Sequence, residues 1–145
     1  MADWSEQARS VVEDSGRRTG GAREAVVDVL AAENCCLSAQ EIATKLHGRD
    51  RQVGLASVYR ALELLQGLGL VQRLDTGEGA SKFERVLPDG EHHHHAICER
   101  CGALTPFEDS ALERAIERLG RRLDHRVSGH DVVIRGLCPE CARAG

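Results

Sequence analysis

Aromatic residues are scarce in this chain of 145 residues: they make up 3% of it, as one Trp, one Tyr and two Phe. A hydrophobic core must therefore consist mainly of Leu, Val, Ile and Ala. No apolar run approaches the roughly 20 residues that cross a bilayer, and residues 1–20 lack the apolar segment of a secretory signal. We therefore expect a cytoplasmic protein with no membrane partner.

An excess of positive charge is also lacking, since 19 Lys and Arg face 23 Asp and Glu, for a net charge of -4. Bulk charge therefore gives no support to nucleic-acid binding. It does not exclude such binding, because affinity for phosphates depends on the few cations at the contact surface. Hydrophobic residues at 41% and charged residues at 29% exclude a disordered chain.

Cysteine and histidine are abundant by contrast, with six and seven residues. Cys98 and Cys101 form one Cys-x-x-Cys pair, and Cys138 and Cys141 form a second. Two such pairs can direct four thiolates to one point, which is the closed tetrahedral site that Zn²⁺ prefers. We therefore expect a structural zinc ion at these four cysteines; a redox pair or two chance pairs are the alternatives.

Four consecutive histidines, at 92–95, precede the first cysteine pair. Successive side chains of a β-strand point to opposite faces, so His92 and His94 would face one way and His93 and His95 the other. One strand could then contribute to two separate metal sites. The alternative is a solvated polar strand that binds no metal.

The periodicity of apolar residues predicts two small domains of α+β class. The first half has the element order of a winged helix-turn-helix, with helices at 4–14, 22–32, 38–47 and 55–68 and a β-hairpin at 70–75 and 81–86. An arbitrary small α+β domain is the alternative. The second half predicts strands at 92–98 and 104–107, a helix at 110–123 and a closing hairpin around Ser128 and Gly129. We expect a domain at 1–86, a hinge at 87–91 and a second domain at 92–145.

Three segments together resemble the ferric uptake regulator (Fur) family: the helix GLASVYRALELL, a hairpin that ends in Phe83 and Glu84, and HHHHAICERCG followed by the distal cysteine pair. The resemblance covers residues 5–141 in order. It implies a homodimeric, metal-dependent transcriptional repressor and not an enzyme. Each chain would join a winged-helix DNA-binding domain to a C-terminal α/β dimerisation domain, and metal would promote operator binding.

The resemblance also implies two further metal sites. The sensor site between the domains falls on Cys36, Glu84, His93 and His95, and the second site falls on His92, His94, Glu113 and His130. Each residue also has a simpler interpretation. Cys36 could be a buried apolar thiol, Glu84 a solvated strand carboxylate, and Glu113 the end of a capping box that begins at Ser110. Cys35 matches no ligand of the family.

In the family, the helix with the VYR motif enters the major groove of DNA. That resemblance implies base or phosphate contacts by Ser57, Tyr59 and Arg60, with Val58 and Leu62 turned inward. Arg18 occupies the place of a basic minor-groove residue, and Arg23 matches an arginine of the family. Gly20 stands where members usually have Thr, so this position has no side chain for helix capping or a phosphate contact.

The regulatory metal is predicted to be zinc, as in the zinc uptake regulator branch, because a thiolate with imidazoles favours Zn²⁺ over Fe²⁺. The alternative is an iron-responsive repressor, which Glu84 favours. Two alternative functions from other classes are a metallohydrolase and a metal-storage module. The sequence contains no His-Glu-x-x-His motif, which argues against the metallohydrolase.

Overall fold

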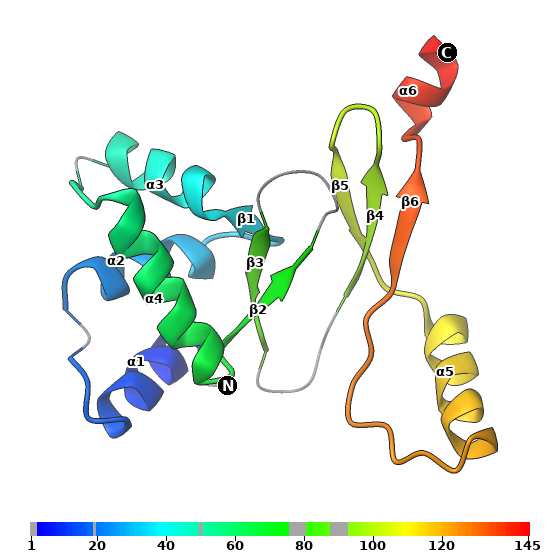
Figure 1. The fold of residues 1–145 in the computed structure, drawn as a ribbon, viewed down its shortest axis with the longest axis horizontal. Coiled ribbons are helices and arrows are strands. Elements are labelled where there is room, and N and C mark those ends of the chain that lie inside the picture. Colours follow the sequence, from blue (N-terminus) through cyan, green and yellow to red (C-terminus); the bar gives the residue numbers. More distant parts are fainter. Residues whose placement is uncertain (1–2, 19, 50, 76–80, 88–92) are drawn as a thin grey trace. The chain divides into compact units, whose positions relative to one another are not determined.

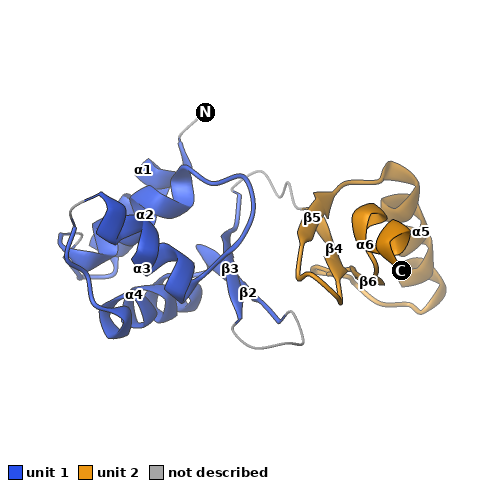
Figure 2. Ribbon diagram, turned by 90° about the horizontal axis from the view of Figure 1, so that it is seen from above, with its two compact units in different colours: residues 1–91 blue, residues 92–145 orange. Residues whose placement is uncertain are grey.

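The computed structural model describes residues 3–18, 20–49, 51–75, 81–87 and 93–145. The chain divides into two compact units, unit 1 at 1–91 and unit 2 at 92–145 (Figure 2). Most of the predicted hinge, the turn of the first hairpin and His92 lie outside the described residues.

Unit 1 consists of helices and a small sheet, one strand of which lies between two of the helices in the chain (Figure 1). Its helices are α1 (Trp4–Asp14), α2 (Ala22–Ala31), α3 (Ala39–Gly48) and α4 (Leu55–Gly67). Strands β1 (Leu37–Ser38), β3 (Lys82–Arg85) and β2 (Val71–Leu74) form an antiparallel sheet in that order. The predicted helices and hairpin are all present, and α1 has the predicted bounds.

The core of unit 1 is aliphatic, as the composition predicts. Its largest fully buried side chains are Leu30, Ile42, Leu46, Leu62 and Leu65. Trp4 lies in the same core at 3% exposure, where its indole Nε1 donates to the carbonyl of Leu70 at 3.2 Å. The single tryptophan therefore reports on the folding of unit 1.

Two helix starts differ in how they are capped. At α3 the predicted capping box is confirmed, because Ser38 Oγ accepts from the Glu41 N–H at 3.1 Å and the Glu41 carboxylate accepts from the Ser38 N–H. At α2 no side chain caps the helix. Its N-cap is Gly21 with φ 70°, a conformation that disfavours any residue with a Cβ.

Unit 2 contains one sheet and two helices. Its strands are β4 (His94–Cys98), β5 (Leu104–Phe107) and β6 (Val133–Gly136), and its helices are α5 (Ser110–Arg122) and α6 (Pro139–Ala144). Strand β4 is central, antiparallel to β5 and parallel to β6. The α+β class is therefore confirmed for both units.

The predicted closing hairpin around Ser128 and Gly129 is wrong. No strand is described at 126–127, and β6 joins the sheet beside β4 in the parallel direction. A parallel neighbour requires a long crossover, which α5 and the segment after it provide. The spacing of apolar residues on the 110–123 helix predicts that Leu112, Ile116, Leu119 and Leu123 face inward, but Leu119 and Leu123 are 42% and 56% exposed. Within the described residues, no helix combines the length and hydrophobicity needed to span a bilayer.

Candidate metal centres and nucleic-acid interface

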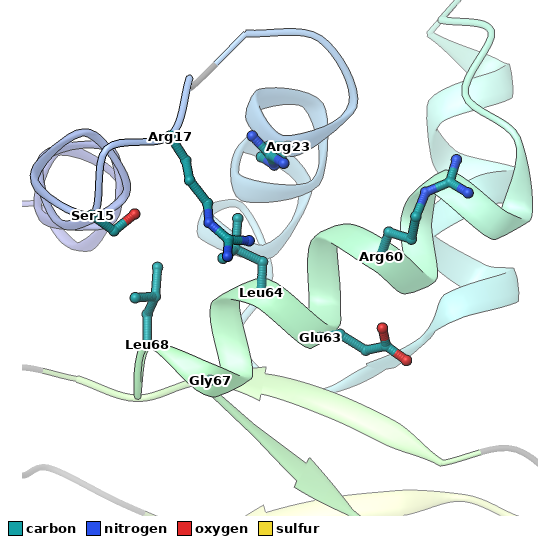
Figure 3. A pocket seen from close by; sticks show the side chains of 8 residues that line it. All are labelled: Ser15, Arg17, Arg23, Arg60, Glu63, Leu64, Gly67 and Leu68. Atoms are coloured by element: carbon teal, nitrogen blue, oxygen red, sulfur yellow. The ribbon is translucent and has the colours of Figure 1, made fainter.

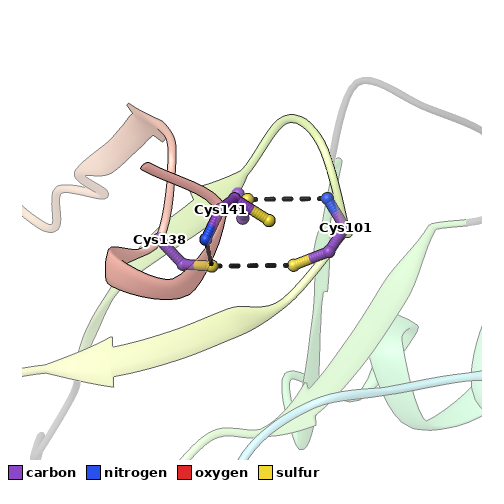
Figure 4. Close-up of side chains that lie close together, drawn as sticks. Cys101, Cys138 and Cys141 are labelled. Atoms are coloured by element: carbon purple, nitrogen blue, oxygen red, sulfur yellow. Dashed lines mark hydrogen bonds between the residues drawn. The ribbon is translucent and has the colours of Figure 1, made fainter. Parts of the chain in front are cut away.

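Four cysteine thiols converge at one end of the unit 2 sheet. The parallel pairing of β4 and β6 sets Cys98 opposite Gly136, which brings the two cysteine pairs together. All four sulfurs lie within 4.8 Å of one another, and Cys101 Sγ lies 3.8 Å from Cys138 Sγ (Figure 4). The sequence-predicted cysteine residues are thus brought together.

Backbone N–H groups surround these sulfurs. Cys98 Sγ accepts from the Cys101 N–H at 3.5 Å, and Cys138 Sγ accepts from the Cys141 N–H at 3.4 Å. The N–H groups of Cys101 and Cys138 lower the pKa of Cys98 to about 6. The hydrogen bond with Cys138 raises the pKa of Cys141 to about 12. Four thiolates need a soft cation to offset their charge, and this all-sulfur donor set fits Zn²⁺.

A second cluster joins His94 of β4, Glu113 of α5 and His130, which precedes β6. His94 Nε2 lies 2.6 Å from Glu113 Oε1, and His130 Nε2 lies 2.9 Å from Glu113 Oε2. The three residues meet the geometry of a metal-ligand group. His92, the fourth predicted ligand, lies outside the described residues.

The interpretation of Glu113 as part of a capping box is wrong. The N-cap of α5 is Asp109, whose carboxylate accepts from the Leu112 N–H at 2.9 Å. The Glu113 carboxylate is therefore directed to the two histidines. Because His94 Nδ1 accepts from the Val132 N–H at 3.3 Å, the proton of the neutral ring is on Nε2 and is donated to Glu113. A metal ion bound at Nε2 would replace that proton.

In unit 1, Cys36 and Glu84 are both buried, at 8% and 2% exposure. Strand β1 pairs Leu37 with Phe83, so one further step in register sets Cys36 opposite Glu84. The Glu84 carboxylate also accepts from the Gln72 amide of β2. The interpretation of Glu84 as a solvated strand carboxylate is therefore wrong.

Cys35 had no predicted role, yet Cys35 and not the predicted Cys36 belongs to the metal-ligand group of Glu84, with its thiol within 4.8 Å of a carboxylate oxygen. Its sulfur is 3.6 Å from that of Cys36. The hydrogen bond with Cys35 and then burial raise the pKa of Cys36, and the Glu84 charge raises it further. Burial and these neighbours therefore disfavour a bare Cys36 thiolate.

In unit 2, the predicted alternation of the histidine run is confirmed for the described residues. The rings of His93 and His95 lie 4.9 Å apart, with ligand nitrogens within 4.8 Å of each other. The ring of His94 instead lies 5.2 Å from that of His130 and 5.6 Å from that of Phe107. One strand therefore presents imidazoles to two different surroundings.

The predicted nucleic-acid interface centres on α4. Val58 and Leu62 are buried as predicted, whereas Tyr59 is 41% exposed and Arg60 is exposed. Arg60 donates to Ser57 Oγ at 3.1 Å, so two predicted contact residues lie together on the outer face of the helix. Arg18 is exposed in the segment between α1 and α2, and its carbonyl accepts from Arg23 at 3.0 Å.

An open pocket of about 590 Å³ lies between that segment and α4. Arg17 reaches across it toward Leu64, and Arg23 of α2 borders the same space (Figure 3). Arg60 also lines the pocket, with its guanidinium turned outward. None of these three arginines forms an ion pair with any described residue. Glu63 of α4 lines the pocket as well, so the lining carries three guanidinium groups and one carboxylate.

Sequence reasoning missed two residues of these sites. Arg17 had a signal, because it precedes Arg18 in a glycine-bearing break, but the resemblance matched only its neighbour. Cys35 had the signal of an adjacent cysteine. A helix start would separate the two side chains, whereas the structure has a bend at Asn34 and Cys35 before β1.

Comparison with known proteins identifies the relatives of this chain. Residues 14–135 match the model of the ferric uptake regulator family. The chain is 35% identical over 121 residues to the ferric uptake regulation protein of Bacillus subtilis, covering 82% of this chain and 81% of that protein. It is 34% identical over 131 residues to the protein of the same description from Legionella pneumophila, covering 90% and 95%.

Solved structures agree with the sequence comparison. The ferric uptake regulator of Helicobacter pylori, described as having three functional metal-binding sites, superposes with a TM-score of 0.83. It is 28% identical, and the match covers 96% of this chain and 91% of that one. The Vibrio cholerae regulator superposes with a TM-score of 0.79 at 28% identity, covering 90% and 98%.

Proposed function

The chain belongs to the ferric uptake regulator family and is therefore a metal-responsive transcriptional regulator, not an enzyme; we propose that it senses zinc and represses metal-uptake genes. Membership of a family of regulators removes the metallohydrolase alternative. The observation that carries the zinc proposal is the presence of two thiols beside a buried carboxylate: Cys35 Sγ lies within 4.8 Å of a Glu84 carboxylate oxygen, and Cys36 Sγ lies 3.6 Å from Cys35 Sγ.

A structural Zn²⁺ ion at Cys98, Cys101, Cys138 and Cys141 is the first part of the proposal. The four sulfurs lie close enough for one ion, and their N–H donors stabilise thiolate charge. Unit 2 has few aromatic residues and only partly buried apolar side chains on α5. A metal that joins β4 to α6 would supply stability that its core lacks.

The regulatory site of the proposal consists of Cys36 and Glu84 from unit 1 and His93 and His95 from unit 2. In unit 1 the strand register sets Cys36 opposite Glu84, and in unit 2 the rings of His93 and His95 lie 4.9 Å apart. A metal that binds donors from both units favours one arrangement of the units over others. Its differential affinity for that arrangement is the free energy available for regulation.

The second site of the proposal consists of His92, His94, Glu113 and His130. The described three residues form a closed hydrogen-bonded cluster within unit 2. The H. pylori relative has three functional metal-binding sites, which matches the number proposed here. Imidazole and carboxylate ligands suit either Zn²⁺ or Fe²⁺ at this position.

Operator DNA and a second copy of the chain are the proposed partners. Arg18, Ser57, Tyr59 and Arg60 would contact double-stranded DNA, and the pocket bordered by Arg17 and Arg23 would accept a backbone phosphate. Leu119, Leu123, Ile134 and Leu137 of unit 2 are each more than 40% exposed, which fits an apolar face covered in a homodimer. A DNA-binding regulator of this family would act in the cytoplasm.

Iron is the second candidate for the regulatory metal. It is favoured by the Glu84 carboxylate and by the two relatives, which are ferric uptake regulation proteins. Zinc and iron can be distinguished experimentally, because the regulatory metal is the one that increases the affinity of the protein for DNA more strongly.

The test selects duplexes from a random library with the full-length protein in the presence of Zn²⁺, then measures binding by fluorescence anisotropy. The selected duplex is titrated with no added regulatory metal, with Zn²⁺, and with Fe²⁺ without oxygen. We expect Zn²⁺ to tighten binding at least ten-fold, about 1.4 kcal/mol, and Fe²⁺ to do so less. Equal affinity with and without metal would refute the function, and a larger effect of Fe²⁺ would refute zinc as its metal.

A further inference from the structure

Two adjacent cysteines, Cys35 and Cys36, place their sulfurs 3.6 Å apart immediately before β1. Adjacent side chains of an extended strand point to opposite faces, so this convergence is not a default of the backbone. It arises because the chain bends at Asn34 and Cys35 before the strand starts. The bend therefore presents two soft donors at one point of unit 1.

The separation of the two sulfurs fits a shared metal ion. Two thiolates bound tetrahedrally to one zinc at about 2.3 Å lie roughly 3.8 Å apart. In the four-cysteine cluster, Cys101 and Cys138 have that separation, 3.8 Å. Cys35 and Cys36, at 3.6 Å, differ from it by 0.2 Å, which a small side-chain rotation removes.

A third donor lies beside the pair. A carboxylate oxygen of Glu84 lies within 4.8 Å of Cys35 Sγ, and Glu84 is 2% exposed. Burial of a carboxylate is costly unless a positive charge or several hydrogen bonds offset it. Gln72 donates one hydrogen bond to this carboxylate, and a divalent cation held by the two sulfurs would add a positive charge beside it.

We infer that Cys35 and Cys36 bind one thiophilic divalent cation together, as a dithiolate with Glu84 as the third ligand of unit 1. This inference rests on the proposed regulatory site and changes its chemistry from one sulfur donor to two. Two thiolates shift preference further toward Zn²⁺ or Cd²⁺ and away from Fe²⁺ and Mn²⁺. Binding replaces both thiol protons, so two protons leave the pair and no electron is transferred.

The intensity of the sulfur-to-cobalt absorption band measures how many thiolates bind the metal ion. The full-length protein, with its four-cysteine cluster filled by Zn²⁺, is titrated with Co²⁺ while the sulfur-to-cobalt charge-transfer band is recorded. Cys35→Ser and Cys36→Ser should each lower the band to about half, and the double variant should remove it. Asn34→Ser, in the same bend, is the matched control and should retain the full band.

Alkylation of the wild-type protein provides a measurement that needs no variant. Iodoacetamide labelling followed by mass spectrometry is compared before and after a second equivalent of Zn²⁺. We expect zinc to protect both Cys35 and Cys36 by at least ten-fold in rate. Protection of Cys36 alone, or a full cobalt band in Cys35→Ser, would show that Cys35 is not a ligand.

The dithiolate and the proposed function fail in different measurements. If DNA binding by the wild-type protein does not depend on metal, the proposed function is wrong. The intensity of the cobalt band would still show whether two sulfurs bind the ion. Conversely, a band from one sulfur, with metal-dependent DNA binding intact, would overturn only the dithiolate. If neither cysteine variant changes the band, the pair binds no metal and the inference is wrong.

Discussion

Glu113 holds two histidines with one carboxylate, and its removal tests the second cluster. We expect Glu113→Ala to lower the stability of unit 2 by about 1–3 kcal/mol, because the buried His94 Nε2–H loses its acceptor. Urea denaturation followed by far-ultraviolet circular dichroism measures the loss. Glu117→Ala, an exposed position one turn later on α5, is the control and should be nearly neutral. Equal stability of both variants would contradict the cluster's structural role.

Arg17 and Arg60 border one pocket and should have different effects on DNA binding. We expect Arg17→Ala to weaken specific and non-specific duplexes alike, and to reduce the slope of log affinity against log salt by about 0.9. Arg60→Ala should instead relax discrimination between duplexes, since the side chain lies on the exposed face of α4.

Anisotropy titrations at several salt concentrations separate these outcomes. Arg114→Ala, an exposed arginine of unit 2, is the charge-matched control and should bind DNA like the wild type. An Arg17→Ala variant with the wild-type salt slope would remove the pocket from the DNA interface. A uniform loss in Arg60→Ala would assign it to phosphate contact instead.

For individual residues, the sequence predicts which residue types could bind metal better than it predicts where their side chains point. The alternation of His93, His94 and His95 follows from strand geometry alone and is confirmed. The proximity of Cys35 to Glu84 depends on a bend that no periodicity reveals. The role of Glu113 was ambiguous for a similar reason, because Asp109 competes with Ser110 for the N-cap.

At the scale of elements, the start of α3 joins a helix to the sheet. Ser38 is both the last residue of β1 and the N-cap of α3, and Lys82 of β3 pairs with Glu41 at 2.5 Å. We expect Ser38→Ala to lower the stability of unit 1 by about 1 kcal/mol, because a buried helix start loses its side-chain acceptor. The fluorescence of Trp4 during urea denaturation measures this change.

Thr44→Ala on the exposed side of α3 is the comparison variant. Its hydroxyl donates to the Gln40 carbonyl within the helix, so its loss should cost less than that of the cap. If Ser38→Ala and Thr44→Ala unfold at the same urea concentration as the wild type, the cap contributes nothing measurable.

Elements with strong local signals were predictable, and those defined by long-range pairing were not. Helix α1 and the capped start of α3 follow from periodicity and capping chemistry in consecutive residues. The local sequence predicts a hairpin for β6, because Ser128 and Gly129 favour a turn. Its true partner is β4, more than 30 residues away, and only the crossover through α5 reveals that pairing.

On the scale of the whole molecule, α5 has an apolar face that the rest of a single chain does not bury. Its apolar residues recur at helical spacing, yet Leu119 and Leu123 are largely exposed. The periodicity therefore predicts an apolar face that requires a packing partner, but it does not identify the partner. The proposed homodimer would cover this face with a second copy of the chain.

The two units should also depend differently on the structural metal. Unit 1 has a continuous aliphatic core around Trp4, whereas unit 2 has few buried apolar side chains among its described residues. Structural zinc sites contribute on the order of 10 kcal/mol to folding, so unit 2 should require the four-cysteine cluster. Unit 1 should fold without it.

Cys138→Ser tests this dependence, because one substitution opens a site that needs all four thiolates. We expect the variant to lose zinc, to sediment as a monomer and to lose the circular dichroism of unit 2. Trp4 fluorescence should keep its wild-type emission and urea midpoint, since the only tryptophan lies in unit 1. Ala142→Ser, beside Cys141 in α6, is the matched control and should remain dimeric and zinc-loaded. A dimeric Cys138→Ser protein with full circular dichroism would show that the four cysteines do not hold unit 2 together.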